Sequence, residues 1–371
     1  MATMPPHSEN TEATLPVARL PRLLLGALAI LLTIAFLVWG YMVLGDRSSP
    51  LPKPAITAFA VVWGVGGLLL VYTVSNWVVE QLPGRAVELL LPVVFIGPAV
   101  LFLAYFLVLP AIRTVASSFF GTNGIEFVGL ANFVTVFTQR VTQVALRNNL
   151  LWLAFGATMS VLMGLVIAAL ADRSRFEVIA KSIIFMPVAI SLVGAGVIWR
   201  FLYAVKAPGD PQIGLLNAIW TGLGHEPVGW LASNQPWNNL FLIVVVVWLQ
   251  TGFAMVLLSA AIKGVPADLL DAARVDGATE IQTFMRVVVP TILPTIITVT
   301  TTIVIFTLKI FDIVVVMTSG NFGTGVIATE FYQQFFTNRD FGLGSAIAVV
   351  LLLLVLPVMV YNLRRFRQQQ A

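Results

Sequence analysis

Long runs of apolar residues, each about the length of a membrane-spanning helix, alternate with short polar connections along the chain. The hydrocarbon core of a bilayer is about 30 Å thick, and a helix of about 20 apolar residues crosses it. By this measure the sequence predicts an all-α, polytopic membrane protein with about eight transmembrane helices. They are expected near residues 23–45, 55–80, 87–111, 147–171, 182–205, 238–262, 291–317 and 341–363.

The composition agrees with lipid as the main solvent around the chain. Of the 371 residues, 58% are hydrophobic and 10% are charged, and the mean hydropathy is +0.94. There is no Cys, and the two His, His7 and His225, leave little for a metal site. We therefore predict no catalytic residues, no metal ligands and no enzyme activity. The basic residues lie at the ends of apolar segments, so nucleic acid is not an expected partner.

The distribution of Lys and Arg predicts how the chain is oriented. These residues are more numerous in the loops on the side that holds both termini, which the positive-inside rule places in the cytoplasm. Residues 1–22 are expected to be a cytoplasmic tail, since no signal-peptide cleavage site follows the first apolar run. Residues 23–86 would form extra N-terminal transmembrane helices, residues 87–363 the main transmembrane domain, and residues 364–371 a basic cytoplasmic tail.

One stretch is far more polar than its surroundings. Residues 268–290 carry several charged side chains between two apolar segments. The residues from Leu269 to Val275 predict a short helix, Gly277 suits the left-handed residue that ends it, and Thr279–Gln282 matches a capping box for a second helix. The prediction is two short helices joined by a sharp turn. On local chemistry alone, an amphipathic connector at the membrane interface is an equally good interpretation.

The spacing within this stretch resembles the EAA loop of ABC importer permeases. Asp271-Ala272-Ala273 is followed after three residues by Gly277 and, nine residues later, by residues 287–290, Val-Val-Val-Pro, where the family has Ile-x-Leu-Pro. Asp271 replaces the family's Glu. Four further segments resemble the carbohydrate, maltose-type branch of this binding-protein-dependent type I family: residues 127–133, 198–202, 214–217 and 311–320. The resemblance extends over roughly residues 90–365.

The resemblance implies the permease subunit of an ATP-driven importer with the type I permease fold. Asp271, Ala272, Ala273, Arg274 and Gly277 would belong to a cytoplasmic coupling helix that docks on a separate ATPase. The implied partners are a second homologous permease subunit, two ATPase subunits and an extracytoplasmic sugar-binding protein, in a bacterial or archaeal cytoplasmic membrane. The sequence contains no G-x-x-x-x-G-K-[ST] motif, so no cofactor is expected on this chain, and ATP and Mg would bind to the ATPase.

Polar and aromatic residues within the predicted spans are candidates for the substrate path. Lys309 and Asp312 are three residues apart on one face of the seventh predicted helix, where they can neutralise each other. The resemblance implies that they, with Thr307, border the path. Gln250 and Phe253 share a face of the sixth span and offer an amide and an aromatic ring to a sugar. Packing is an equally good interpretation of that pair.

The loops and the absent features bear on the substrate. Trp220, Trp230 and Trp237 are most simply an interfacial aromatic belt, with docking of a binding protein as the alternative. Only residues 111–145 separate the third and fourth spans, where the eight-span maltose permease has a large insertion, so we expect a general disaccharide or oligosaccharide importer. Two alternatives stay open. One is an ABC permease for polyamine, phosphate or glycerol phosphate. The other is a secondary transporter or channel, which would show inverted repeats with broken helices, and the sequence shows no clear one.

Overall fold

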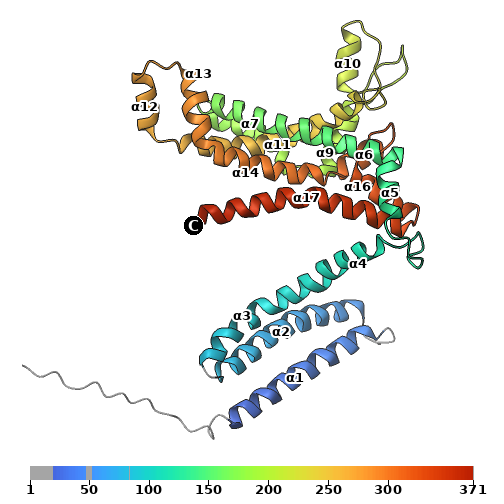
Figure 1. Ribbon diagram of the computed structural model, residues 1–371, viewed down its shortest axis with the longest axis vertical. Helices are drawn as coiled ribbons and strands as arrows, with labels where there is room; N and C mark the ends of the chain where they lie inside the picture. The colour runs from blue at the N-terminus through green and yellow to red at the C-terminus, as the bar shows by residue number, and fades with distance from the viewer. Residues whose placement is uncertain (1–19, 47–51, 83, 371) are drawn as a thin grey trace, which may run out of the picture. The chain divides into compact units, whose positions relative to one another are not determined.

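The computed structural model describes residues 20–46, 52–82 and 84–370, and these residues form almost entirely helices (Figure 1). Within these ranges the only β pairing is an isolated antiparallel bridge between Phe120 and Phe127. Seven helices are long and apolar enough to cross a membrane, and one bent helix pair makes an eighth candidate span. The all-α class and the approximate number of spans are therefore confirmed. The contacts divide the chain into two compact units, Met1–Ala111 and Ile112–Ala371.

The first unit contains three long helices. They are α1 (Leu20–Gly45), α2 (Lys53–Glu80) and α3 (Gly84–Leu103), and α3 continues through a π-helical turn, η2 (Ala104–Val108), into α4 (Leu109–Ser117). α2 packs against both α1 and α3. One aromatic side chain of α2 serves each contact: the indole of Trp63 donates to the Phe36 carbonyl, and the hydroxyl of Tyr72 donates to the Phe95 carbonyl, both at 3.3 Å. Most other apolar side chains here are exposed, as expected for helices that face lipid.

Several predictions about the chain ends stay predictions. Residues 1–19 of the predicted N-terminal tail lie outside the described residues. The predicted boundary between residues 23–86 and 87–363 rested on the resemblance. The two compact units are defined by contacts within the chain, and their boundary lies after Ala111. Residues 364–370 continue the last helix, α17 (Phe341–Gln370). The cytoplasmic location of either terminus follows only from the distribution of positive charge.

The second unit is organised around α11 (Trp237–Lys263). Its most extensive neighbour is α7 (Thr158–Ala171), and α14 (Val289–Leu308) packs against it as well. Gly164 of α7 allows the two backbones to meet, because a Cβ there would lie 2.5 Å from the Ala254 Cβ. In the most apolar stretch of α11, 56% of the residues are buried inside the protein. A helix that is covered on most sides needs no polar stripe, which explains why α11 is apolar all round.

The other helices of this unit lie toward its two ends. Their bounds are α5 (Ala131–Thr138), α6 (Arg140–Leu151), η3 (Trp152–Ala157), α10 (Leu215–Gly222), α12 (Ala267–Val275), α13 (Glu280–Thr283), η5 (Phe284–Val288), α15 (Asp312–Thr318), α16 (Ile327–Tyr332) and η6 (Gln333–Thr337). We call the end that holds α12 and α13 the elbow end, and the end that holds α5, α10 and α16 the loop end (Figure 1). Three spans extend well beyond their predicted bounds, since they cover Arg85–Ser117, Arg140–Ala171 and Glu280–Leu308.

The span predicted at residues 182–205 is wrong as a single helix. α8 (Glu177–Phe185) passes through a short 3-10 turn, η4 (Met186–Ala189), and α9 (Leu192–Leu202) follows with a bend of 104°. Pro187 has no backbone N–H to continue the helix, and the hydroxyl of Ser191 caps α9 by accepting from the Gly194 N–H at 3.1 Å. The chain thus contains a broken helix, although the sequence showed no clear example.

The span predicted at residues 291–317 is also divided. α14 ends at Leu308, and α15 begins at Asp312 after a short non-helical segment. Lys309 and Asp312 therefore do not share a helix face, and the predicted i,i+3 arrangement is wrong. The ion pairs of the described residues do not include this pair. Residues 306–312 contain neither Pro nor Gly, so the break has no local sequence signal. Tertiary hydrogen bonds account for it instead.

Asn149 supplies those hydrogen bonds, and it is one of four buried asparagines at the loop end. We call them the asparagine quartet: Asn148, Asn149, Asn238 and Asn239. The amide of Asn149 donates to the Leu308 carbonyl at 3.3 Å, where α14 ends, and its oxygen accepts from the Ile327 N–H at 2.8 Å, where α16 begins. Backbone groups freed at a helix break inside a membrane have no water partner, so a side chain must satisfy them. Asn149 serves both breaks at once.

The quartet also fixes the loop between α15 and α16. Asn148 donates to the carbonyls of Gly323 and Gly325 at 2.8 and 2.7 Å, and Asn238 donates to the Phe322 carbonyl at 2.7 Å. Loop 319–326 needs this support because several of its residues adopt the left-handed conformation. Phe322, with φ +59°, is the bulkiest of them. A side chain with Cβ rarely stays there unless its surroundings hold it.

We predict that Asn149→Leu destabilises the second unit. Leu has a similar size but leaves the Leu308 carbonyl and the Ile327 N–H buried without partners, and each such group costs about 1–3 kcal/mol. The thermal midpoint of the detergent-purified protein should therefore fall clearly below that of the wild type. Asn234→Leu is the matched control, because Asn234 is exposed at the same end. Equal midpoints for the two variants would show that Asn149 does not hold the breaks.

Candidate functional site

The polar stretch forms an elbow at one end of the second unit. We use this name for residues 267–283, which comprise α12, the turn at Gly277 and α13. Gly277 has φ +79°, and its N–H donates to the Arg274 carbonyl at 3.0 Å. A left-handed glycine after the last helical turn is a common way to end a helix. The predicted turn at Gly277 is confirmed.

The second helix of the elbow begins with the predicted capping box. The Thr279 hydroxyl accepts from the Gln282 N–H at 3.3 Å, and the Gln282 side chain accepts from the Thr279 N–H at 2.8 Å. α13 then continues without interruption through η5 into α14, so that one helical rod runs from Glu280 to Leu308. The capping box therefore fixes the start of a membrane span, not only of a short surface helix.

The elbow has an inner face that packs against the chain's own helices. Leu270 contacts a small apolar cluster that includes Val288 and Ile292. Ala273 is buried, whereas Ala272 is exposed. Of the two alanines that the resemblance places in the coupling helix, only Ala272 is exposed. Ala273 instead lets α12 lie close to the rest of the second unit.

The outer face of the elbow exposes large apolar side chains next to charged ones. Val275 is 88% exposed, Ile281 77% and Leu269 46%. Asp271 and Gly277 are exposed on the same elbow. Sequence reasoning selected the charged and small residues here but not these three apolar ones. Their helical spacing could not separate an outer face from an inner one, because both faces carry apolar residues.

Three ion pairs connect the elbow internally and to the end of α7. Arg274 contacts Asp271 at 2.9 Å and Glu280 at 3.5 Å, and Glu280 also contacts Arg173 at 2.9 Å. The side chains are 54–69% exposed, so each pair contributes at most about 1 kcal/mol. They orient the elbow more than they stabilise it. Asp271 and Arg274 thus form an ion pair. Arg173 and Glu280 are far apart in the sequence, so their spacing could not predict that they form one.

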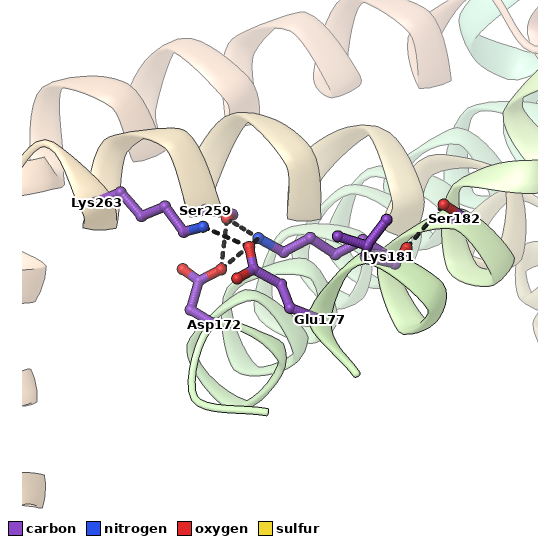
Figure 2. Close-up of polar contacts among 7 residues, drawn as sticks. Asp172, Glu177, Lys181, Ser182, Ser259 and Lys263 are labelled. Atoms are coloured by element: carbon purple, nitrogen blue, oxygen red, sulfur yellow. Dashed lines mark hydrogen bonds and ion pairs between the residues drawn. The ribbon is translucent and has the colours of Figure 1, made fainter. Parts of the chain in front are cut away.

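A second charged group, which we call the lysine cluster, lies where α7, α8 and α11 meet. It contains Asp172, Glu177, Lys181, Ser259 and Lys263 (Figure 2). The Lys181 ammonium contacts the carboxylates of Asp172 and Glu177 and the hydroxyl of Ser259, with 2.6 Å to Glu177. Lys263 of α11 contacts Glu177 as well. The cluster therefore joins the start of the half span α8 to the ends of α7 and α11.

The lysine cluster is better shielded from water than the pairs of the elbow. The side chains of Lys181 and Asp172 are only 18% and 10% exposed. One oxygen of Asp172, Oδ2, is buried without a hydrogen bond in the described part of the chain. Removing one partner of a shielded pair leaves the other charge uncompensated, which is costly. The i,i+4 spacing of Glu177 and Lys181 could have revealed part of this cluster, but its contacts to α11 could not be foreseen.

The elbow and the lysine cluster border one cavity of about 220 Å³. Asp172 and Arg173 line it from the α7 side, and Arg274 and Glu280 line it from the elbow. The described residues contain no group of three or more His, Asp or Glu that could hold a metal ion. The arrangement consists of stiff helices joined by charged contacts. It is suited to transmit a displacement from the elbow to the spans.

The residues predicted for the substrate path occupy different environments. Gln250 of α11 is half-buried, and its amide makes no hydrogen bond within the described ranges. Phe253 packs against a core cluster of α7, α11 and α14. Thr307 is fully buried and donates to the Ile303 carbonyl at 2.7 Å, so it meets other parts of this chain instead of an open path in this conformation. Gln250 keeps an unused amide and is the strongest of these candidates.

The charged candidates and the three tryptophans singled out from the sequence also lie in different environments. Lys309 is exposed and Asp312 is half-buried at the break between α14 and α15. Trp230 packs 5.1 Å from the Phe241 ring, and Trp220 stacks on His225 at 4.2 Å. Of these three tryptophans, Trp237 is 62% exposed and has the exposure that the predicted aromatic belt requires. The other two tryptophans hold the segment around α10 on α11.

Comparisons with known proteins agree with the fold. Residues 160–368 match the model of the family described as binding-protein-dependent transport system inner membrane component. An osmoprotective compounds uptake permease protein of Synechocystis sp. is 55% identical over 276 residues, which are 74% of this chain and 99% of that protein. An alpha-glucoside transport system permease protein of Rhizobium meliloti is 47% identical over 274 residues, 74% of this chain and 81% of that protein.

The fold has a counterpart among solved structures. A chain in the crystal structure of a bacterial ABC transporter involved in the import of the acidic polysaccharide alginate aligns with a TM-score of 0.63 and 22% identity. The alignment covers 73% of this chain and 93% of that one. At this identity the likeness concerns the fold alone. The family model and the relatives, however, each cover more than half of the sequence, and the chain belongs to the binding-protein-dependent inner membrane components, the permease subunits of ABC importers.

Proposed function

We propose that this chain is one of two permease subunits of an importer for an α-glucoside or a related polyhydroxylated osmoprotective compound. The osmoprotective compounds permease and the alpha-glucoside permease described above support this class of substrate over polyamine, phosphate or glycerol phosphate. The observation that carries the mechanism is the elbow, which combines the EAA spacing, a left-handed Gly277 and exposed apolar side chains at the end of a membrane-spanning unit.

The elbow docks on a separate cytoplasmic ATPase. Val275, Ile281 and Leu269 enter a groove of that partner, and Asp271 and Ala272 contact its surface. ATP and Mg bind to the ATPase, and this chain supplies no catalytic residue. Both termini and the elbow lie in the cytoplasm, and the loop end faces the extracytoplasmic binding protein. A second homologous permease subunit and two ATPase subunits complete the importer.

The rod from Glu280 to Leu308 carries the movement. Its 29 residues span about 43 Å at 1.5 Å per residue, enough to cross the membrane. Because η5 joins α13 to α14 without a break, a displacement of the elbow moves the far end of α14 at the loop end. The ion pairs through Glu280 and the lysine cluster make α7 and the half span α8 follow. The substrate path therefore opens and closes as a rigid-body motion.

The first prediction of this model concerns Gly277. A built Cβ at this position meets nothing within 4 Å, so the effect of a substitution is conformational, not steric. Gly277→Val should abolish ATP-driven uptake, because a β-branched residue resists positive φ, whereas Gly277→Asn should retain most of it, because Asn tolerates this conformation. Uptake of labelled maltose, sucrose and trehalose by membrane vesicles with the complete importer measures both.

The abundance of the permease in the membrane and the amount of ATPase that copurifies with it serve as controls. Gly277→Val should insert normally but lose the ATPase or uncouple ATP hydrolysis from uptake. Normal uptake by Gly277→Val would disprove the coupling role of the elbow. Absence of ATP-dependent uptake of all three sugars by the wild type would instead disprove the proposed substrate class.

A second prediction tests the exposed apolar face of the elbow. Val275→Ser and Ile281→Ser should leave the thermal midpoint of the free permease unchanged, since both side chains are more than three quarters exposed. Burial of such side chains in a partner contributes about 1.5–3 kcal/mol each, so copurification of the ATPase should drop about tenfold or more. Leu363→Ser, an exposed change on the last span, is the control. Undiminished ATPase retention in both elbow variants would exclude these residues from the interface.

A third prediction separates the two candidates on α11. Gln250→Ala should reduce uptake with little change in stability, because the amide has no partner within the described part of the chain. The loss of one hydrogen bond to a sugar corresponds to about 1 kcal/mol, or roughly fivefold. Phe253→Ala should instead lower the thermal midpoint, because truncation of a packed Phe costs about 3–5 kcal/mol. Uptake and thermal unfolding of the same preparations distinguish a path residue from a core residue.

A further inference from the structure

A polar cavity of about 400 Å³ at the loop end has no assigned role. It lies among α6, loop 319–326, α16 and Gln235, which lies two residues before the start of α11. Its polar and aromatic lining consists of Arg140, Gln235, Asn321, Phe322 and Glu330, together with glycines of the loop. Ligand cavities in proteins range from about 300 to 1,000 Å³, so this one has room for a small organic molecule.

Glu330 is the most unusual residue of this cavity. Burial raises the pKa of its carboxyl, and no hydrogen bond or ion pair reaches that carboxyl within the described ranges. A Cβ added to Gly325 would lie 3.0 Å from Glu330 Oε1, which places the carboxyl against the loop. Partly buried carboxylates ordinarily have a partner, because burial without one is costly. Here solvent or a bound molecule supplies the partner.

The surrounding loop offers the complementary donors. Most of its carbonyls are used, since the asparagine quartet donates to those of Phe322, Gly323 and Gly325. The backbone N–H groups of these same three residues make no hydrogen bond in the described structure. Arg140 and Asn321 add a guanidinium and an amide on exposed side chains. The cavity thus presents one strong acceptor among several donors.

Phe322 adds an apolar surface to this polar lining. Its side chain is 59% exposed, although its backbone is held at φ +59°. A bulky residue with Cβ is uncommon in that conformation, and Gly would fit it without strain. The sequence keeps an aromatic ring at a position whose backbone favours glycine. Such strain is typical of sites where the side chain itself has a role.

The balance of these groups selects the chemistry of the ligand. A single carboxylate beside donors does not suit a metal cation, which requires several oxygen ligands. The same carboxylate repels anions. A neutral polyhydroxylated molecule fits, because each hydroxyl both donates and accepts hydrogen bonds and the C–H face of a sugar ring stacks on an aromatic side chain. We propose that this cavity is an entry site that binds a sugar hydroxyl through Glu330 and a sugar ring face through Phe322.

The inference rests on the proposed function, since it makes the cavity the first permease site that the imported glycoside meets at the extracytoplasmic side. It adds a place and two residues to that function. The site lies at the loop end and is separate from Gln250, which belongs to the central helix. Sugar released by a binding protein would be held here before it passes toward α11.

The test uses the complete importer with its binding protein. Uptake of maltose, sucrose and trehalose is first measured with the wild type, and the sugar that it transports best is the probe sugar. Glu330→Ala and Glu330→Gln should lower its uptake about tenfold at saturating binding protein, because each removes the charged acceptor. Glu226→Gln, which changes an exposed carboxylate in the segment between α10 and α11, should have no effect. Uptake by both Glu330 variants within twofold of wild type overturns the entry site and leaves the proposed function intact. No uptake of any of the three sugars by the wild type overturns both.

Monodeoxy analogues of the probe sugar separate binding from a structural role. If Glu330 accepts a bond from one hydroxyl, the wild type should transport the analogue lacking that hydroxyl about tenfold less well than the parent sugar. Glu330→Ala should transport both equally. If Glu330→Ala still transports the analogue as much less well than the parent sugar as the wild type does, the carboxylate does not contact the sugar. That result overturns the proposal.

Phe322→Gly provides a second, independent variant. Gly relieves the left-handed backbone, so the thermal midpoint should stay the same or rise, while the loss of the ring should lower uptake severalfold. A gain in stability combined with a loss of transport distinguishes a binding residue from a packing residue. Normal uptake by this variant would exclude Phe322 from the site.

Discussion

Backbone groups that leave a helix inside a membrane must find hydrogen-bond partners within the protein, and the second unit depends on how it meets this requirement. α14 and α16 each have a terminus at a break, and both use the same side chain, Asn149. Asn148 and Asn238 satisfy the carbonyls of the loop between α15 and α16. Because all four members of the quartet are buried, water cannot replace any of them. The quartet thus satisfies a non-helical loop between two helices and also fixes its shape.

The two ends of the second unit are held by interactions of different strength. At the loop end, the amides that hold loop 319–326 are buried and have no alternative partner. At the elbow, the ion pairs of Arg274 and Glu280 are more than half exposed and can exchange with water or with another protein. A surface that must release and rebind a partner benefits from weak contacts of its own. At the proposed entry site, a loop that presents the Phe322 ring in a fixed position benefits from strong ones.

Much of this arrangement could be predicted from the sequence, because the signals were local. Apolar runs gave the spans, and the spacing of Asp271 and Gly277 with the capping box at Thr279 gave the elbow, down to the positive φ of the glycine. The bend after α8 had a partial signal in Pro187, which the length of the apolar run concealed. In each case the deciding interaction lies within a few residues of the position it determines.

The errors have a common physical cause. Residues 306–312 contain no helix breaker, and the helix ends at Leu308 where an amide from α6, far away in the sequence, binds its carbonyl. Asn148 is likewise far in sequence from the loop it holds, and so is Arg173 from Glu280. A hydrogen bond of this kind replaces the next turn of the helix, so helical periodicity cannot foresee where it acts. Four asparagines in two adjacent pairs were the visible signal. Amides buried in a membrane helix are costly unless they have hydrogen-bond partners, so these pairs indicate contacts with other parts of the chain without showing which.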